Sequence, residues 1–568
     1  MGDSYIIAVD FGTTFSGYAY SLTPRNAEIT LHLKTWGKLL SLQTTKTPTC
    51  ILFDEQEEFL KFGFEAKMAY NNMRGEEAQK CFFFEGFKMA LYGTKVNSHM
   101  MITAANGKSM KALKVFTAAL SYMKEDALRT ISKNTAGKMF VSSDFTWVLT
   151  VPAIWDPSAK QFMREAATQA GIVTEGSEDK LVIALEPEAA SLWCKKLSAN
   201  GFITEEHGGE ALDQSAGTQY IVVDCGGGTI DITVHEVLNG GALKELHKAS
   251  GNNLGGQTID ANFKLFLREI FSGGVWDEYE KKYPGELQKM MYDFTFLKKT
   301  DEDVQMICPY NLGLLAQKHQ GIERFLKEVK GASWDDGWIK ISRAKLRSFF
   351  DDSLTGITNS LREILRKELN IQVILLVGGY ADSQILRQHI IDEFGHQCKV
   401  LCPIQAQEAI MKGAVMFGRN PAVVKTRKST FTYGLSVSER FDESRHKNFK
   451  KYSNKDGDWC IDIFMKLVEI DEDVSWDETR EHILYPVDGD DTRMKIRFYR
   501  TERRKARYVD EWGIEEAGSF YVNMPDTKRG MNRQVKLELR FGSTEITATG
   551  TDKASGSTKS IKMDFMTK

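Results

Sequence analysis

The chain has 568 residues and a net charge of −3 at neutral pH, with 42% hydrophobic residues. This length allows two or more domains with real cores, and the composition argues against a disordered protein or one that attracts nucleic acid through its overall charge. No stretch approaches 18 consecutive apolar residues and no signal-peptide pattern opens the chain, so we expect a cytoplasmic protein, with a nuclear location also open, and no transmembrane segment.

The first predicted element is a buried strand that ends in a carboxylate. Tyr5-Ile-Ile-Ala-Val-Asp10 leads directly into Phe11-Gly12-Thr13-Thr14. Glycine permits a sharp turn and lets backbone N–H groups approach an anion. A carboxylate beside such a cradle favours a cation between the two, and Mg²⁺ suits this place because it keeps several waters and uses few protein carboxylates. Taken alone, the motif also fits an ordinary strand and turn.

Strands and helices alternate in the next part of the chain. Residues 146–151 are predicted to form a strand, and a helix follows with Asp156 as N-cap and Pro157 as its first residue. A second helix is predicted from Glu186-Pro187 towards Leu197, and residues 198–218 have the composition of an exposed loop. This alternation is typical of an α/β fold.

A second strand repeats the design of the first. Tyr220-Ile-Val-Val-Asp224 is followed by Cys225-Gly226-Gly227-Gly228-Thr229-Ile230-Asp231. Three consecutive glycines at the end of a strand are costly unless something needs a close approach to the backbone. The two motifs together predict a phosphate site that is split between two lobes, with Mg²⁺ between them.

The α/β pattern continues to about residue 420. Residues 257–365 are predicted to be mainly helical, and residues 374–377 form a buried strand that ends in Gly378-Gly379-Tyr380. Helices are predicted to follow from about residue 382 and from about residue 407.

The pattern changes to short alternating strands after about residue 430. Runs such as 494–498, 535–541 and 561–565 alternate apolar and polar residues, so residues 430–568 are predicted to form a β-rich domain, joined by a basic linker at 421–429. One strand and the turn after it carry a basic cluster, which fits either a solvated face or an anionic partner such as phospholipid headgroups or an acidic protein segment. The cluster comprises Arg493, Lys495, Arg497, Arg500, Arg503, Arg504, Lys505 and Arg507.

The order of these motifs resembles the superfamily of actin, sugar kinases and the 70-kDa heat-shock ATPases. The resemblance is strongest to the atypical heat-shock 70-kDa protein 12A/12B-like group and covers nearly the whole chain. It is carried by Asp10-Phe-Gly-Thr-Thr-Phe-Ser-Gly17, Val151-Pro-Ala, Glu186-Pro-Glu-Ala-Ala190, Asp224-Cys-Gly-Gly-Gly-Thr-Ile-Asp231, Asn253-Leu-Gly-Gly256 and Leu376-Val-Gly-Gly379, and by the run from Val535 to Phe565, which is similar to the last strands of the family's β-sandwich.

The resemblance implies a fold and a function for each part of the chain. Residues 1–420 would form a two-lobed actin-like ATPase domain of the α/β class. Residues 430–568 would form a small β-sandwich-like domain that binds protein clients or signalling partners, without the helical lid into which the family continues. The implied function is a Mg-dependent, ATP-binding, chaperone-like protein with slow ATPase activity, and the implied cofactors are ATP or ADP and Mg²⁺.

The resemblance also assigns roles to single residues. Lys88, Glu186, Thr229 and Asp231 would act on the γ-phosphate and the attacking water. Asp10 and Asp224 would hold Mg²⁺ through water. The nucleotide would be bound by Gly12, Thr13, Thr14, Gly226, Gly227, Gly228, Thr229, Gly255, Gly256, Lys298, Lys299, Gly378, Gly379 and Tyr380.

Some positions depart from the family pattern. Gln257 and Gln407 stand where acidic residues are usual, and Asp382 stands where the family has an arginine that stacks on adenine. The resemblance therefore leaves the preference for adenine open. The basic linker and the end of the sequence at Lys568, before a lid, both weaken the expectation of ATP-driven clamping on clients.

Three functions remain as alternatives at this stage. The first is a slow ATPase of the heat-shock 70 type that acts on partners through its C-terminal domain. The second is a nucleotide-gated scaffold or signalling adaptor with little or no hydrolysis. The third is a small-molecule kinase of the same superfamily, which the C-terminal β-rich domain argues against.

Overall fold

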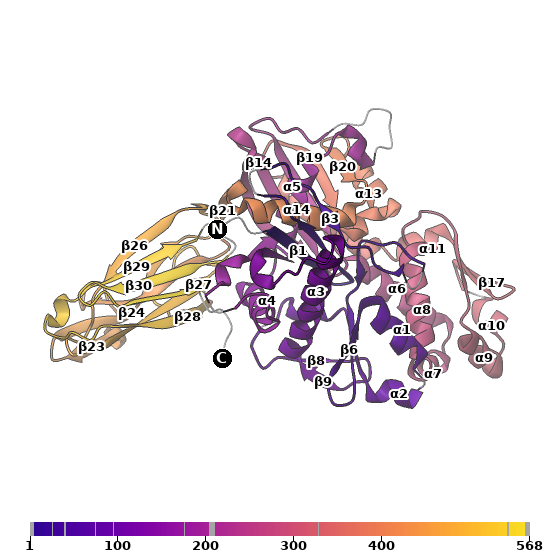
Figure 1. Cartoon of the computed structure of the whole chain (residues 1–568), viewed down its shortest axis with the longest axis horizontal. Coiled ribbons are helices and arrows are strands. Elements are labelled where there is room, and N and C mark those ends of the chain that lie inside the picture. The colour runs from indigo at the N-terminus through magenta and orange to yellow at the C-terminus, as the bar shows by residue number, and fades with distance from the viewer. Residues whose placement is uncertain are drawn as a thin grey trace.

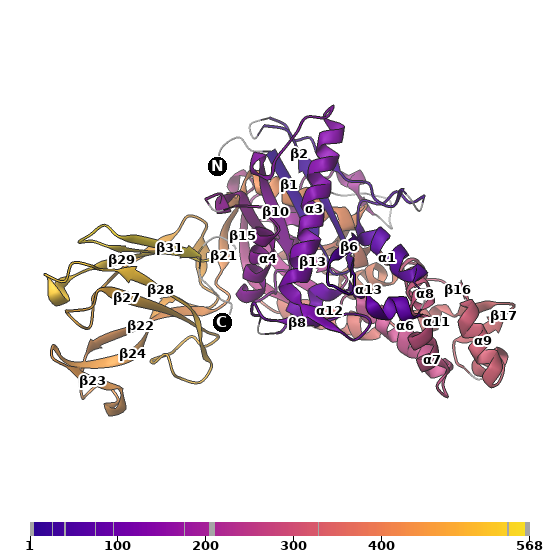
Figure 2. The same ribbon diagram turned by 60° about the horizontal axis from the view of Figure 1, so that its bottom comes forward.

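The computed structural model describes residues 5–562 except 25–26, 39–40, 74, 95, 175, 204–210, 328 and 542–544. Two α/β lobes lie against each other, and a domain of β-strands extends from one side of them (Figure 1). Figure 2 shows the same separation from a second direction. Within the described residues, no helix combines the length and the apolar character needed to cross a bilayer.

The first lobe is built on a mixed sheet in the order β11-β10-β1-β2-β3, with β4 also paired to β2. Its strands are β1 (Tyr5–Phe11), β2 (Phe15–Ser21), β3 (His32–Leu33), β4 (Thr47–Pro48), β10 (Phe145–Val151) and β11 (Leu181–Leu185). Helices α3 (Ala112–Asn134) and α4 (Pro157–Gln169) contribute apolar residues to the core of this lobe. The lobe also contains β5 (Cys50–Phe53), β6 (Phe59–Phe62), α1 (Gly63–Asn72), α2 (Gly75–Lys80), β7 (Phe82–Glu85), β8 (Met101–Thr103) and β9 (Ser109–Lys111).

Helix α4 begins as the sequence predicts. Asp156 is its N-cap, and the Asp156 carboxylate accepts a hydrogen bond from the Ser158 backbone N–H at 2.9 Å. Pro157 is the first helical residue, where its missing N–H leaves no donor unpaired. The local pattern was sufficient because the cap and its partner lie two residues apart.

The second lobe is built on a sheet in the order β12-β20-β19-β13-β14-β15-β21-β25. Its strands are β12 (Phe202–Ile203), β13 (Gln219–Cys225), β14 (Ile230–Val237), β15 (Leu243–Asn252), β19 (Ile371–Val377), β20 (Lys399–Pro403), β21 (Val424–Lys428) and β25 (Asp473–Ser475). Helices α6 (Gly256–Ile270), α12 (Asp351–Leu365) and α13 (Gln384–Phe394) share a core with this sheet.

The prediction that residues 257–365 are mainly helical is confirmed, but it did not include three short strands. Three four-residue strands, β16 (Val304–Ile307), β17 (Ala332–Asp335) and β18 (Trp338–Ile341), form a small antiparallel sheet in the order β16-β18-β17. Strands this short leave only two inward-facing residues each, so the surrounding helical pattern masks them. The helices around them are α7 (Val275–Lys282), α8 (Pro284–Leu297), α9 (Tyr310–His319), α10 (Ile322–Leu326) and α11 (Arg343–Ser348).

Two helices pack between the sheets of the two lobes. Helices α5 (Glu186–Cys194) and α14 (Ala409–Arg419) share a core with residues from both sheets, including Val148 and Val222. The helix backbones approach closely at Gly413, where an added Cβ would lie 1.6 Å from the Ala189 carbonyl oxygen. Only glycine fits at this crossing.

The C-terminal segment contains two antiparallel sheets that share one core. The five-stranded sheet has the order β23-β24-β22-β27-β28 and the four-stranded sheet the order β26-β29-β30-β31. Of the predicted strand 561–565, Ile561 lies in β31, whereas Met563 and Phe565 lie outside the described residues. The strands are β22 (Thr432–Arg440), β23 (Lys451–Asn454), β24 (Gly457–Val468), β26 (Thr479–Leu484), β27 (Arg493–Thr501), β28 (Ile514–Asn523), β29 (Val535–Arg540), β30 (Thr547–Asp552) and β31 (Thr558–Lys562).

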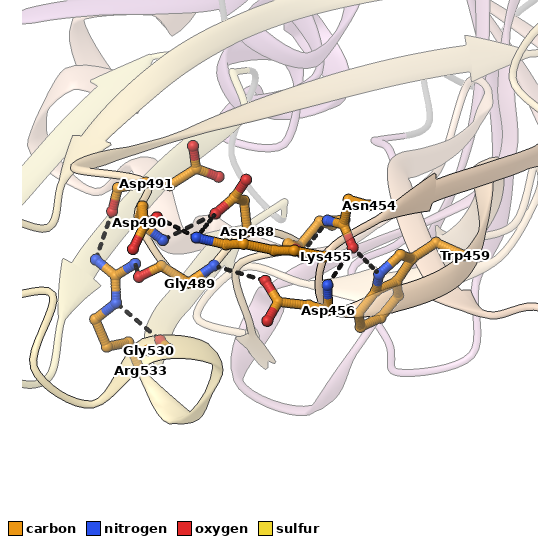
Figure 3. A network of polar contacts seen from close by, with 11 residues as sticks. Asn454, Lys455, Asp456, Trp459, Asp488, Gly489, Asp490, Asp491, Gly530 and Arg533 are labelled. Atoms are coloured by element: carbon orange, nitrogen blue, oxygen red, sulfur yellow. Dashed lines mark hydrogen bonds and ion pairs between the residues drawn. The ribbon is translucent and has the colours of Figure 1, made fainter.

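A buried arginine holds the loops at one end of these sheets. Arg533 is 1% exposed and donates hydrogen bonds to the backbone carbonyls of Gly489, Asp491 and Gly530 (Figure 3). It also donates to the Met524 carbonyl. These carbonyls belong to irregular backbone, where a guanidinium with five N–H donors can replace missing ladder bonds.

The predicted linker, 421–429, contains a strand of the second lobe. β21 pairs in parallel with β15 and antiparallel with β25, which follows the first strands of the C-terminal segment. Two further ion pairs join the C-terminal segment to the first lobe: Arg500 with Asp156 at 2.6 Å, and Arg164 with Glu545. Two basic residues of the predicted linker form ion pairs, Arg427 with Glu188 and Lys428 with Asp473.

Candidate functional site

Two strand pairs of the same design deliver carboxylates to the cleft between the lobes. In the first lobe, Asp10 on β1 lies opposite Gly17 on β2, and in the second lobe Asp224 on β13 lies opposite Asp231 on β14. All three carboxylates are buried, and Asp10 and Asp224 line one cavity. The repeated motif therefore places its two halves in one site, as the sequence predicts.

The glycine-rich loops that follow these strands face each other across the cleft. A Cβ added to Gly227 would lie 2.1 Å from the Thr14 hydroxyl, and one added to Gly228 would lie 2.8 Å from the Thr13 hydroxyl. Glycine is required because the threonine hydroxyls of the first lobe approach the backbone of the second. The cavity wall thus presents backbone and hydroxyl groups from both lobes, a donor set that suits phosphate oxygens.

A buried ion pair lies beside these loops. Lys88, within a 3₁₀ turn at Phe87–Leu91, contacts Glu186 at 2.7 Å, and Glu186 is the first residue of α5. The Lys88 ammonium also lies 5.1 Å from the centre of the Trp155 ring. Asp231 accepts a hydrogen bond from the Ile154 backbone N–H at 2.9 Å. Residues from four distant segments thus meet around the two glycine-rich loops.

The site contains a second buried lysine, Lys46, which the sequence analysis did not identify. The Lys46 ammonium lies 2.6 Å from Asp10 Oδ2, while the Thr150 hydroxyl donates to Asp10 Oδ1 at 3.0 Å. Lys46 is buried and lines the same cavity. Its neighbours Thr45 and Thr47 give the segment the composition of a surface turn, so no signal in the sequence indicated a buried cation.

Burial and mutual repulsion raise the pKa values of the carboxyl groups in the cleft. The pKa of Asp224 lies well above its ordinary value because the group is buried near Glu186, Asp231 and Asp10, although Lys46 opposes the rise. Burial raises the pKa of Glu186 to about 7 against the opposing effect of Lys88. Burial also raises the pKa of Asp231. A bound cation would relieve this excess of negative charge.

The residues present fit a hydrated magnesium ion. Within the described residues, Thr14 Oγ1 and Asp224 Oδ1 are buried and have no hydrogen-bond partner. Buried polar atoms are rarely left in this state, so their common position in the cavity points to a bound group. Asp10 and Asp224 would hold Mg²⁺, which takes oxygen ligands and retains several waters.

The other end of the cavity is bordered by the third glycine motif. Gly378 has φ +88°, and an added Cβ would lie 2.4 Å from Asp224 Oδ1, so no other residue fits. Gly379, Tyr380 and Gly256 line this end of the cavity. Sequence reasoning missed the aromatic side chains of its wall, Phe64, Tyr292 and Phe296, and the carboxylate Asp260.

The two predicted lysines at this end are already paired with carboxylates. Lys298 contacts Asp260 at 2.6 Å and donates to the Gly256 carbonyl at 2.7 Å. Lys299 contacts Asp382 at 3.3 Å. Asp382, which departs from the family pattern, therefore neutralises a lysine of the cavity wall instead of contributing a stacking cation.

Most of the predicted site residues lie together. Two of them do not line the cavity. Gly255 packs against the backbone of the glycine-rich loop, where an added Cβ would lie 2.6 Å from the Gly227 carbonyl oxygen, and Asp231 accepts the Ile154 N–H. The roles of all the predicted site residues stay predictions. The residues that line it are Asp10, Gly12, Thr13, Thr14, Lys88, Glu186, Asp224, Gly226, Gly227, Gly228, Thr229, Gly256, Lys298, Lys299, Gly378, Gly379 and Tyr380.

The basic cluster of the C-terminal segment does not line this cavity. Arg500 contacts Asp156 and Glu515, Arg503 contacts Glu511, and Arg504 contacts Glu469 and Asp471. Arg493 and Lys495 lie over the Tyr521 ring. Part of the cluster thus forms ion pairs within the protein, which agrees with a solvated face, and the anionic partner stays a prediction.

Comparisons with known proteins agree with this geometry. The family model described as Hsp70 protein matches residues 75–422. The chain is 33% identical to human heat shock 70 kDa protein 12A and 31% identical to human heat shock 70 kDa protein 12B, in each case over 99% of this chain and 91% of the relative. It is also 26% identical to the chaperone protein DnaK of Mycoplasmopsis synoviae, over 48% of this chain and 39% of the relative. The chain belongs to the Hsp70 family.

Proposed function

We propose that the chain binds ATP and ADP with Mg²⁺ between its two lobes and hydrolyses ATP slowly. The observation that carries this proposal is the meeting of two strand–Asp–glycine loops, one from each lobe, in a single cavity. The cavity continues to Gly378 and to the aromatic wall, which offers room for a nucleoside beyond the phosphates. Membership of the Hsp70 family supports the same ligand.

The chain's own groups divide the work of phosphoryl transfer. Mg²⁺, when bound through Asp10 and Asp224, would neutralise charge on the β- and γ-phosphates. The Gly226–Gly228 backbone and the Thr13, Thr14 and Thr229 hydroxyls would hold the phosphate oxygens. Lys88 would offer its ammonium to the γ-phosphate, and Glu186, whose pKa is raised to about 7, could accept a proton from the attacking water at neutral pH.

We propose that the C-terminal β-strand segment binds protein partners or clients. The support is a set of exposed aromatic side chains on that segment, among them Phe449, Trp512 and Tyr521. Exposed aromatic side chains are enriched at protein interfaces.

Single-turnover hydrolysis of bound ATP tests the proposal, measured with and without an unfolded peptide. A slow turnover that the peptide accelerates supports a chaperone-like ATPase, whereas ATP that stays bound and uncleaved supports the nucleotide-gated scaffold. Thr229→Ala should slow hydrolysis more than it weakens ATP binding, because its hydroxyl would act on the transferring phosphate. Failure of the protein to bind ATP or ADP at all would overturn the proposal.

A further inference from the structure

Lys46 is a buried cation that forms an ion pair with Asp10 of the proposed phosphate site. Its ammonium lies 2.6 Å from Asp10 Oδ2, and the two side chains are 10% and 2% exposed. A long, flexible side chain loses conformational freedom when it is buried in this way, and both charges lose water. Buried ion pairs contribute little to the stability of a fold. The Lys46–Asp10 pair is therefore more easily explained by a function in the site.

The backbone around Lys46 directs the side chain to this place. Strand β4 begins at Thr47, which pairs with Ser16 on β2. The next residue on β2 is Gly17, directly opposite Asp10, and a Cβ added to Gly17 would lie 3.0 Å from Lys46 Cγ. Because Gly17 has no side chain, there is space for the Lys46 side chain to extend to Asp10.

Hydrogen bonds fix the lysine's backbone on both sides. The Thr44 hydroxyl donates to the Lys46 carbonyl at 2.7 Å, and the Thr45 hydroxyl donates to Glu408 at 2.9 Å. Thr47 accepts a hydrogen bond from the Phe64 N–H at 3.0 Å. The ammonium is thus held in position before any ligand arrives, which reduces the entropy lost on binding.

The charges of the cleft explain what a fixed cation contributes. Four buried carboxylates, those of Asp10, Glu186, Asp224 and Asp231, stand at the phosphate end, and the lysines that line this end are Lys46 and Lys88. Lys88 is paired with Glu186. A polyphosphate that enters would be repelled by the carboxylates unless cations separate them. Lys46 stands on the Asp10 side and Lys88 on the Glu186 side.

We propose that Lys46 is a permanent cation of the phosphate site, which bridges Asp10 to the nucleotide's phosphates and lets the protein bind nucleotide when Mg²⁺ is absent. The inference rests on the nucleotide function proposed above. Lys46 would bind the phosphates beside the metal. The alternative is that Lys46 only neutralises the Asp10 carboxylate and does not contact the nucleotide.

The test measures ADP affinity by calorimetry with saturating Mg²⁺ and with EDTA. Three substitutions are compared with the unmodified full chain: Lys46→Met, which removes the charge at similar length, Lys46→Arg, which keeps it, and Lys114→Met, an exposed control. We expect Lys46→Met to weaken ADP binding about tenfold to a hundredfold in EDTA, and several times less with Mg²⁺. Lys46→Arg should retain most of the affinity in EDTA, and Lys114→Met should change neither value.

The outcomes separate this inference from the function on which it rests. Equal losses for Lys46→Met with Mg²⁺ and with EDTA would overturn the role of Lys46, as would tighter binding of Mg·ADP, which would make the lysine a competitor of the metal. A chain that binds no ADP in either buffer would overturn both proposals. If Lys46→Met does not fold, the ADP affinity of Lys46→Arg relative to the unmodified chain decides, measured in both buffers. A large loss of affinity that occurs only with Mg²⁺ contradicts the inference, and an affinity that is kept in EDTA supports it.

Discussion

Arg427 and Glu188 form a buried ion pair with two parallel hydrogen bonds. Arg427 Nε lies 2.9 Å from Glu188 Oε1, and Arg427 Nη2 lies 2.7 Å from Glu188 Oε2. The pair links strand β21, between the domains, to helix α5, whose first residue is Glu186. The Arg427 guanidinium also lies 5.6 Å from the centre of the Trp476 ring. A basic residue in the segment between the domains thus serves as an internal contact.

Removing one member of this ion pair should lower the free energy of unfolding. Arg427→Met leaves the Glu188 carboxylate buried without its partner, and such changes cost about 3–5 kcal/mol. We expect a lower thermal midpoint and earlier proteolysis between residues 420 and 430. The double substitution Arg427→Met with Glu188→Leu should recover most of the loss, because neither member of the pair is left as a buried charge without the other. A double variant as unstable as the single one would show that the pair's charge is not the cause.

Glu245 should make stability depend on pH. Burial and the nearby Glu188 raise its pKa to about 7, from an ordinary value of 4.5. Between these two values the folded state binds more protons than the unfolded state, so this group's contribution to stability is lost as the pH rises from about 4.5 to 7. Glu245→Gln should flatten the dependence of the thermal midpoint on pH in that window, since an amide oxygen can still accept the Lys428 N–H.

The exposed Glu269→Gln, on α6, is the matched control for this measurement. It should follow the unmodified chain at every pH. A Glu245→Gln profile that is parallel to that of the unmodified chain would contradict the raised pKa.

Gly413→Ala should separate helices α5 and α14. The added methyl would overlap the Ala189 carbonyl oxygen, and overpacking of this kind typically costs about 1–3 kcal/mol or more. The matched control is Gly313→Ala in helix α9, where the nearest atom, Cys308 Sγ, lies 3.9 Å from an added Cβ. That substitution should be neutral or stabilising by up to about 1 kcal/mol, because alanine favours the helix. Thermal unfolding that ranks both variants alike would refute the close helix contact.

Arg533→Met should destabilise the C-terminal segment selectively. The substitution leaves four backbone carbonyls without their donor, and each unsatisfied buried group costs about 1–3 kcal/mol. We expect faster hydrogen–deuterium exchange in the loops of Figure 3, around residues 488–491 and 524–534, with little change in the two lobes. The exposed Arg529→Met should leave exchange unchanged. Uniform exchange changes along the chain would argue against a local role.

The predicted elements that the structure contains, and the predicted residues that it brings to one cavity, depend on short-range patterns in the sequence. Asp10 and Asp224 were found because the strand, the carboxylate and the glycines follow one another directly. Lys46, Arg427 and Arg533 were missed because their partners are brought near by folding; Glu188, for example, lies 239 residues from Arg427. Composition treats a lone lysine or arginine as a surface charge, and only the tertiary structure reveals which ones are buried.

The sheet of the second lobe also has a mechanical consequence. From β13, which carries Asp224 near its end, neighbouring strands are hydrogen-bonded in the order β13-β14-β15-β21-β25. The C-terminal segment is therefore joined to the second lobe through shared sheet hydrogen bonds. It can separate from the lobe only if the strand pair β15–β21 or the pair β21–β25 opens. The amide protons of Val424–Lys428 would act as a gauge of that opening.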